Sequence, residues 1–192
     1  PGACGGWLEA LERYGTMDAL TVFRPAIEYA EDGFAVTVKN HEFIAGSAED
    51  LRAYSGEGVD YLLDGRPPQP GEIIVQRDLG ASLRAIAEGG SQVFYRGEIG
   101  ARIVEHVERI GGLLTAADLE GFRPQWQDPI ATTYRGYTIS GPPPPSQTAQ
   151  YLLQLKMLEA YDLTEMGHNT EATLHLFLES AKLAVADRTV YT

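Results

Sequence analysis

The chain has 192 residues, 44% of them hydrophobic, and a formal net charge of −12 with an isoelectric point near 4.7. A chain of this size can bury a real core, and its surplus of carboxylates argues against binding to nucleic acid or to an anionic membrane surface. Its apolar runs are far shorter than the roughly 20 residues that cross a bilayer, and a single cysteine permits no internal disulfide.

Helical patterns of apolar residues fill most of the first 124 positions. The expected helices lie at residues 5–14, 18–32, 77–88 and 98–110, with two short ones between 36 and 54 and another opened by Thr115 and Asp118. The spacing of Thr115 and Asp118 resembles a capping box in which aspartate replaces the usual glutamate.

Glycine and proline set the other expected boundaries. Pro25 is expected to divide the helix at 18–32, because proline has no backbone N–H, and Gly33 is expected to cap its end. A break around Gly46 and Ser47 separates the two short helices. The stretch 64–71 is expected to be a loop, since its prolines and glycines suit no regular structure.

A β-hairpin is expected in the remaining part of the chain. Residues 130–134 and 137–140 are rich in β-branched and aromatic side chains, which favour strands. Arg135 and Gly136 lie between them at hairpin spacing, although Arg-Gly is a weaker turn signal than Asn-Gly. The hairpin would expose unpaired edges, so the chain is expected to self-associate or to cover them with its own termini.

Four prolines at 142–145 follow the hairpin. Because proline fixes φ and donates no hydrogen bond, they are expected to form a stiff polyproline rod of roughly 12 Å. Ser146 lies where an N-cap would lie, ahead of a helix over 147–160. A last helix over 171–188 is expected to bury one apolar stripe. That stripe consists of Leu174, Phe177, Leu178, Ala181 and Val185.

Several sequence runs match one family in order along nearly the whole chain. They are Leu-Arg-Ala-Ile-Ala-Glu-Gly-Gly at 83–90, Phe-Tyr-Arg-Gly at 94–97, Gly-Gly-Leu-Leu-Thr at 111–115, Tyr-Arg-Gly-Tyr at 134–137 with the proline run, and Leu-Ala-Val-Ala-Asp-Arg at 183–188. Through them the chain resembles the central part of the large subunit of the γ-glutamyltransferases (γ-glutamyltranspeptidases), a branch of the N-terminal-nucleophile hydrolases.

The resemblance implies an α+β, mostly helical fold. The chain would be one fragment, 1–192, of an αββα sandwich with one β-hairpin. Residues 1–124 would form a helical large-subunit region, and residues 125–192 the hairpin, the proline run and two core helices.

The resemblance also implies a mechanism. Such enzymes are made as a precursor that cleaves itself before a threonine, whose hydroxyl becomes the nucleophile and whose own amine becomes the base. The Thr-Thr-His-type segment that this threonine opens is absent, because Thr132 and Thr133 are followed by Tyr134. The chain is therefore expected to hold no catalytic residue and to be inactive alone. Its partners would be a missing N-terminal segment and the small subunit, and its substrate a γ-glutamyl compound or a related small amide, with no cofactor or metal.

Ser146 and Gln147 are the candidate substrate-binding residues. In the family, serine and glycines usually follow the prolines, close to the small subunit, whereas Gln147 and its successors replace those glycines here. Either residue could hydrogen-bond a substrate amide or merely cap the following helix, and the sequence favours the cap.

Other reactive side chains have plainer explanations. Cys4 lies in Ala-Cys-Gly-Gly, with no motif that places a histidine beside it, and is expected to be inert. His175 and Glu179 are four residues apart, a spacing that a metal could use. A catalytic zinc needs a third protein ligand, however, and only His168 is near in sequence.

Two alternatives stay open. Asp187 and Arg188 could anchor separate partners at a helix end, or they could shape the wall of an active site. The whole chain could also be a non-catalytic binding or scaffold module derived from the family. A parent reading frame that continues past Thr192 to a threonine-led small subunit would favour the enzyme.

Overall fold

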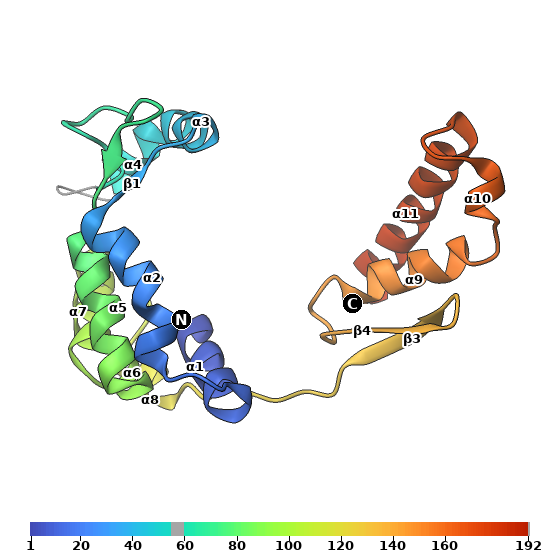
Figure 1. Cartoon of the computed structure of the whole chain (residues 1–192). Helices are drawn as coiled ribbons and strands as arrows, with labels where there is room; N and C mark the ends of the chain where they lie inside the picture. The colour runs from blue at the N-terminus through green and yellow to red at the C-terminus, as the bar shows by residue number, and fades with distance from the viewer. Residues whose placement is uncertain (55–59, 192) are drawn as a thin grey trace. The chain divides into compact units, whose positions relative to one another are not determined.

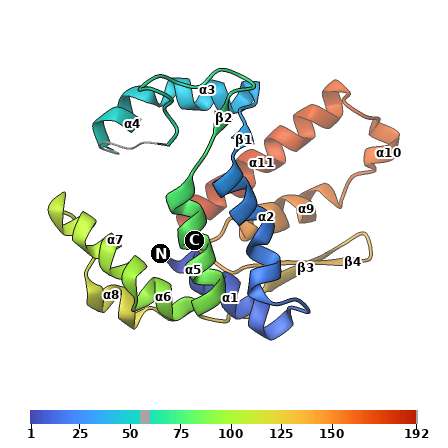
Figure 2. The ribbon, with the colours of Figure 1, turned by 60° about the vertical axis from the view of Figure 1, so that its left-hand side comes forward.

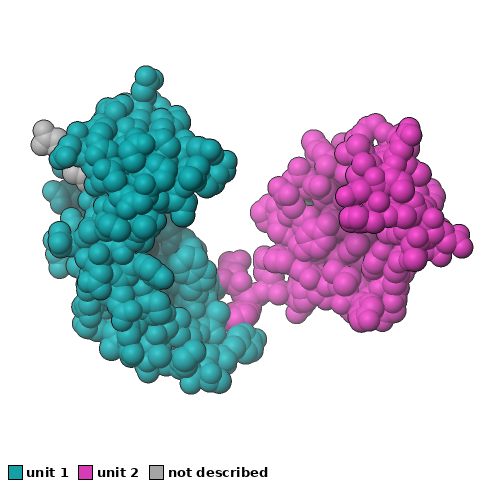
Figure 3. Space-filling view, turned by 45° about the horizontal axis from the view of Figure 1, so that its top comes forward, with its two compact units in different colours: residues 1–124 teal, residues 125–192 magenta. Residues whose placement is uncertain are grey.

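Helices make up most of the chain in a computed structural model, which describes residues 1–54 and 60–191 (Figures 1 and 2). Internal contacts divide the chain into two units, residues 1–124 and 125–192, which Figure 3 colours separately. None of the described helices combines the length and the apolar character needed to cross a bilayer.

The described part of the first unit is mostly helical and contains one short pair of strands. Its elements are α1 (Gly2–Tyr14), α2 (Ala19–Asp32), β1 (Phe34–Ala35), α3 (Val38–Gly46), α4 (Ala48–Tyr54), β2 (Ile73–Ile74), α5 (Arg77–Gly89), α6 (Ser91–Tyr95), α7 (Glu98–Arg109) and α8 (Ala116–Gly121). The predicted capping box is confirmed, because Thr115 Oγ1 accepts from the Asp118 N–H while Asp118 Oδ2 accepts from the Thr115 N–H. Helix α6 was not predicted, since Gly90 at φ 67° ends α5 and leads directly into it.

Helices α2 and α5 form the main packed pair of this unit and lie side by side in both ribbon views (Figures 1 and 2). Ile27 of α2 and Ile86 of α5 are buried, and Arg84 donates to Glu31 at 2.7 Å. The expected division at Pro25 is wrong, because α2 continues through it. The φ of proline suits a helix, so one missing N–H bond does not break a helix that packs along a neighbour.

The pair β1–β2 was not predicted either. It joins residues far apart in sequence, with Phe34 opposite Ile74 and Ala35 opposite Ile73. Gly33 caps α2 as predicted and has a φ of 91°, which sends the chain into β1. Ile74 is fully buried, so this short pair belongs to the core of the unit.

The second unit holds the predicted hairpin. Its elements are β3 (Ile130–Tyr134), β4 (Tyr137–Gly141), α9 (Thr148–Leu158), α10 (Leu163–Met166) and α11 (Glu171–Tyr191). Arg135 at φ 48° and Gly136 at φ 84° form the two-residue turn, and Tyr134 pairs with Tyr137. Positive φ at both central residues is the type I′ geometry that suits the twist of a hairpin.

The predicted buried stripe of α11 is wrong. Leu174, Phe177 and Leu178 are 49%, 42% and 64% exposed. The buried residues of α11 are instead small, namely Thr173, Ser180 and Ala184. Helix α9 packs against α11, and small side chains permit a close approach of the two helices. Periodicity identified an apolar face but not the face that the neighbouring helix covers.

Candidate functional site

The site begins where β4 runs through the prolines into α9. The predicted polyproline rod is wrong, because the chain turns there. The peptide bond between Pro144 and Pro145 is cis, and the Ser146 N–H donates to Pro143 O at 3.2 Å. Proline fixes φ but leaves ψ and the isomer of the preceding bond open, so a proline run does not by itself specify a rod.

The hydroxyl of Ser146 lies inside this turn. Its Oγ is 2.6 Å from Pro142 O and 2.9 Å from Thr148 Oγ1, and it accepts a bond from the Thr148 N–H at 3.3 Å. The N-cap position itself belongs to Gln147, so the predicted cap at Ser146 is displaced by one residue. Ser146 still satisfies an orphan amide at the helix start, which is the physical role that a cap performs.

Thr148 and Tyr151 extend the network of Ser146. Tyr151 Oη donates to Thr148 Oγ1 at 3.1 Å, and Thr148 is only 2% exposed. Gly141, the last residue of β4, faces this pair, and a Cβ built on Gly141 would lie 2.8 Å from both Thr148 Cγ2 and Thr148 Oγ1. A glycine is therefore required where the strand approaches α9.

The far end of α9 holds the hairpin turn. Glu159 accepts the Arg135 N–H at 2.7 Å and pairs with Lys156, whose Nζ also donates to Thr133 O at 3.2 Å. The hydrogen bond from Lys156, followed by that from the Arg135 amide, lowers the pKa of Glu159 below its ordinary value. Helix α9 is thus fixed to the hairpin at both ends, and the start of α9 is held in a defined position.

The predicted site residues differ in their surroundings. Gln147 is exposed, and its side chain makes no hydrogen bond with the part of the chain that the structure describes, whereas the Ser146 hydroxyl is already bonded. A hollow of about 420 Å³ lies beside the turn, and neither Ser146 nor Gln147 lines it. Its lining residues are Gln125, Gln127, Pro129, Ser140, Gly141, Pro142 and Pro143.

Sequence reasoning missed Gly141, Thr148 and Tyr151 as a group. A glycine at a strand end can indicate a close approach of another backbone or side chain. Thr148 and Tyr151, three residues apart, share one face of the helix start. These signals identify the three residues. The contact between Gly141 and the pair on α9 depends, however, on the turn that the prolines make.

Among the described residues, the other reactive side chains form no activated nucleophile or metal centre. Burial raises the pKa of the Cys4 thiol, which disfavours the reactive thiolate. Glu179 accepts two bonds from Lys182, at 2.7 and 2.9 Å, and this pairing lowers its pKa. Within residues 1–54 and 60–191, no three His, Cys, Asp or Glu side chains gather closely enough to hold a metal. His41 is half-buried and donates from Nδ1 to Pro68 O at 2.8 Å.

A family model described as Gamma-glutamyltranspeptidase matches residues 1–192. The chain belongs to the γ-glutamyltranspeptidase family. Among its relatives, the acylase ACY 1 proenzyme of Pseudomonas sp. (strain V22) is 42% identical over all of this chain and 35% of the relative. The glutathione hydrolase proenzyme of Escherichia coli (strain K12) is 34% identical over all of this chain and 33% of the relative. The chain therefore spans about a third of the length of these γ-glutamyltranspeptidase-family proteins.

The structure of this γ-glutamyltranspeptidase-family chain also resembles solved ones. It matches the crystal structure of Helicobacter pylori γ-glutamyltranspeptidase with a TM-score of 0.92 and 31% identity, over all of this chain and 56% of the other. The predicted family and large-subunit region are confirmed. The predicted fold class is confirmed as well, since a mostly helical chain with a β-hairpin matches part of that fold.

Proposed function

We propose that this chain is the large-subunit part of an enzyme that cleaves or transfers γ-glutamyl or related small amide groups. Its partners would be the N-terminal segment and the small subunit of the parent protein. The match of the whole chain to proenzymes of the γ-glutamyltranspeptidase family carries the proposal. The threonine nucleophile would come from outside these 192 residues, so the chain alone would be inactive.

The surroundings of the hydroxyl groups support this placement of the nucleophile. Thr132 and Thr133 lie within β3, paired with Ile139 and Thr138. Their nitrogens are in peptide bonds and cannot act as the amine base that such a threonine needs. Ser146 contacts a carbonyl oxygen, a hydroxyl and an amide, and none of these is a general base.

The proposal is tested by comparing the 192-residue chain with the complete parent protein on a chromogenic γ-glutamyl anilide. We expect chromophore release from the parent protein and none from the chain. Turnover by the chain that survives purification controls would contradict the placement of the nucleophile. A parent protein that releases no chromophore from any small amide would favour the alternative of a non-catalytic binding or scaffold module.

An acylase that acts on other small amides is the second candidate. The identity of 42% to the acylase exceeds the 34% to the glutathione hydrolase, and Gln147 replaces a glycine of the family pattern. The two candidates differ in whether the α-amino group of the donor is needed. The same anilide without that amino group should be a poor substrate for a γ-glutamyl enzyme and a good one for such an acylase.

We assign Gln147 and Ser146 different roles in substrate binding. Gln147 is exposed and would hydrogen-bond the substrate directly, while Ser146 would hold the turn that presents it. In the parent enzyme, Gln147→Ala should raise KM several-fold with little change in unfolding, and Ser146→Ala should lower stability by about 1 kcal/mol. Gln150→Ala is the control. An unchanged KM in Gln147→Ala would remove Gln147 from the site.

A further inference from the structure

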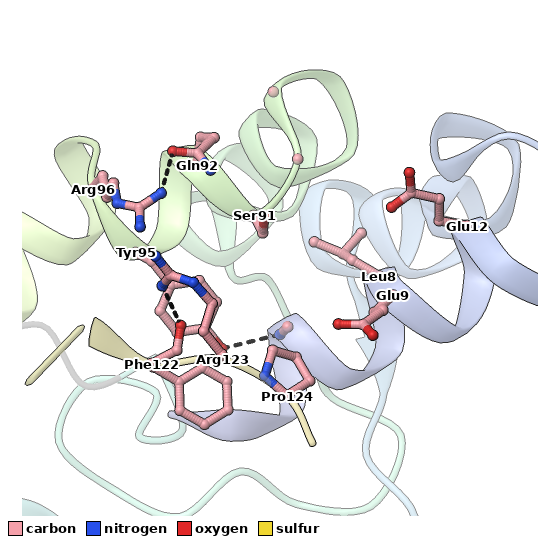
Figure 4. A pocket seen from close by; sticks show the side chains of 13 residues that line it. Leu8, Glu9, Glu12, Ser91, Gln92, Tyr95, Arg96, Phe122, Arg123 and Pro124 are labelled. Carbon is pink, nitrogen blue, oxygen red and sulfur yellow. Dashed lines mark hydrogen bonds between the residues drawn. The ribbon is translucent and has the colours of Figure 1, made fainter. Parts of the chain in front are cut away.

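A second hollow, of about 620 Å³, lies entirely within the first unit (Figure 4). It opens between α1, the start of α6 and the residues that follow α8. Leu8, Tyr95 and Phe122 give it an apolar wall, and the rings of Tyr95 and Phe122 stack with centroids 5.2 Å apart. The volume is in the range of sites that bind small molecules.

The apolar wall is firmly held. Tyr95 is buried, its Oη accepts the Gly5 N–H at 3.0 Å, and it donates to Pro1 O at 2.5 Å. These bonds tie α1 to α6. A Cβ on Gly5 would lie 3.0 Å from Tyr95 Oη, so the contact requires glycine or a very small shift. The hollow is therefore lined by fixed structure, which favours a defined binding geometry.

Two arginines meet at one side of the hollow. Arg96 Nη2 and Arg123 Nη1 both donate to Glu120 O, at 3.1 and 2.7 Å. Because they share one acceptor, these nitrogens lie at most about 6 Å apart. Neither guanidinium pairs with a carboxylate within residues 1–54 and 60–191, and each retains N–H groups beyond those bonded to protein. Two like charges held this close favour an anion between them.

Two carboxylates lie on the α1 side of the same hollow. Glu9 and Glu12 are three residues apart on α1 and line it, and Figure 4 shows them opposite the side that carries Arg96 and Arg123. The formal charges of these four side chains cancel. A ligand that carries one anionic and one cationic end would match this arrangement better than a simple anion, which the carboxylates would repel.

We propose that this hollow binds a small zwitterion, namely a free amino acid or a short peptide. The carboxylate of the ligand would lie between Arg96 and Arg123, its ammonium would face Glu9 and Glu12, and its side chain would contact the apolar wall. The site does not depend on the amide chemistry proposed above, and it lies within one unit of the chain.

The proposal is tested by titrating the isotope-labelled 192-residue chain with trialanine and recording amide chemical shifts. Trialanine with both ends free should shift signals of α1, Ser91 and Arg123. N-acetylation removes the ammonium and C-amidation removes the carboxylate, and each should weaken binding at least tenfold, or about 1.4 kcal/mol. Free alanine in a parallel titration distinguishes an amino-acid site from a peptide site. No shifts at about 10 mM trialanine, or equal binding of the blocked forms, would overturn the proposal.

Two pairs of substitutions sharpen the test. The double variant Arg96→Gln with Arg123→Gln should bind free trialanine at least tenfold more weakly. The control Arg102→Gln, which changes an exposed side chain of α7, should bind it as the unaltered chain does. Loss of the two arginines also removes their hydrogen bonds to Glu120 O and could disturb the structure. The double variant Glu9→Gln with Glu12→Gln keeps those bonds. This second double variant should bind the free peptide more weakly and should bind the N-acetylated peptide with unchanged affinity. If both double variants bind free trialanine as tightly as the unaltered chain does, the peptide does not bind in this hollow.

Discussion

The contact between Gly141 and α9 predicts the effect of one methyl group. In Gly141→Ala, the new Cβ would lie 2.8 Å from Thr148 Cγ2 and Oγ1 and would also overlap Tyr151 Oη. Tyr151 is 41% exposed and can rotate away, but Thr148 is short and 2% exposed. The strand and α9 must therefore separate, and overpacking of this kind costs about 1–3 kcal/mol.

A double-mutant cycle isolates this contact. Thr148→Ala removes both close atoms at a cost of its own of about 1–2 kcal/mol, from a lost methyl group and lost hydrogen bonds. If the steric reasoning holds, Gly141→Ala should then cost little more, so the double variant should be at least about 1 kcal/mol more stable than the sum of the single changes predicts.

Hydrogen exchange of peptides from 137–160 at increasing urea is the appropriate assay, because two units can unfold separately. With a urea slope of about 1 kcal/mol/M, the expected cost of about 1–3 kcal/mol means that Gly141→Ala should lower the midpoint by about 1–3 M. Gly46→Ala is the control, since a Cβ there meets no atom of the described residues within 4 Å and alanine favours the helix. Additive costs in the cycle, or an unchanged midpoint in Gly141→Ala, would refute the reasoning.

Three further predictions concern other parts of the chain. Leu119 is fully buried, so Leu119→Ala should lower the free energy of unfolding of the first unit by about 2–5 kcal/mol, measured by urea denaturation. Two bonds from Arg66, at 2.7 Å each, and then one from the Gln69 amide lower the pKa of Glu72 from 4.5 to about 2. Because the folded-state pKa is the lower one, this carboxylate stabilises the fold above pH 4.5 and loses that contribution as the pH falls to 2, which a carbon NMR titration of Glu72 would follow. The hairpin β3–β4 has no further strand beside it in the described residues, so light scattering should detect concentration-dependent association of the chain.

Each of these predictions has a control and a contrary outcome. Leu119→Met conserves volume and should cost less than about 1.5 kcal/mol, so equal losses in the two variants would rule out a cavity effect. Glu72→Gln should remove the acid-dependent step, and a Glu72 titration midpoint near 4.5 would contradict the pairing with Arg66. A strict monomer with a solvated, ordered hairpin would contradict the expected association.

Some local signals in the sequence were reliable guides to the fold, whereas the prolines at 25 and 142–145 were not. The capping box of Thr115 and Asp118 and the turn at Arg135 each depend on a few neighbouring residues, and both were predicted. The pair β1–β2 was not, because two residues of strand carry no periodicity and the partner lies about 40 positions away. The exposed face of α11 was mistaken for the buried one because α9, a separate helix, decides which face is covered.

The candidate site was predictable only in part. The sequence singled out Ser146 and Gln147, but the partners of Ser146 follow from the turn at Pro144 and Pro145. The arginine pair of the first unit was not predicted, because Arg96 and Arg123 are distant in sequence and meet through one carbonyl oxygen.

The short pair β1–β2 has a consequence for engineering the protein. It pairs Phe34 with Ile74, so the two ends of the segment between the strands, residues 36–72, lie next to each other. We call this segment the excursion. A reporter group or an additional domain inserted into that excursion would leave the register of α2 against α5 unchanged. None of the described residues of the excursion lines either hollow, so a label or an insertion there should leave both hollows undisturbed.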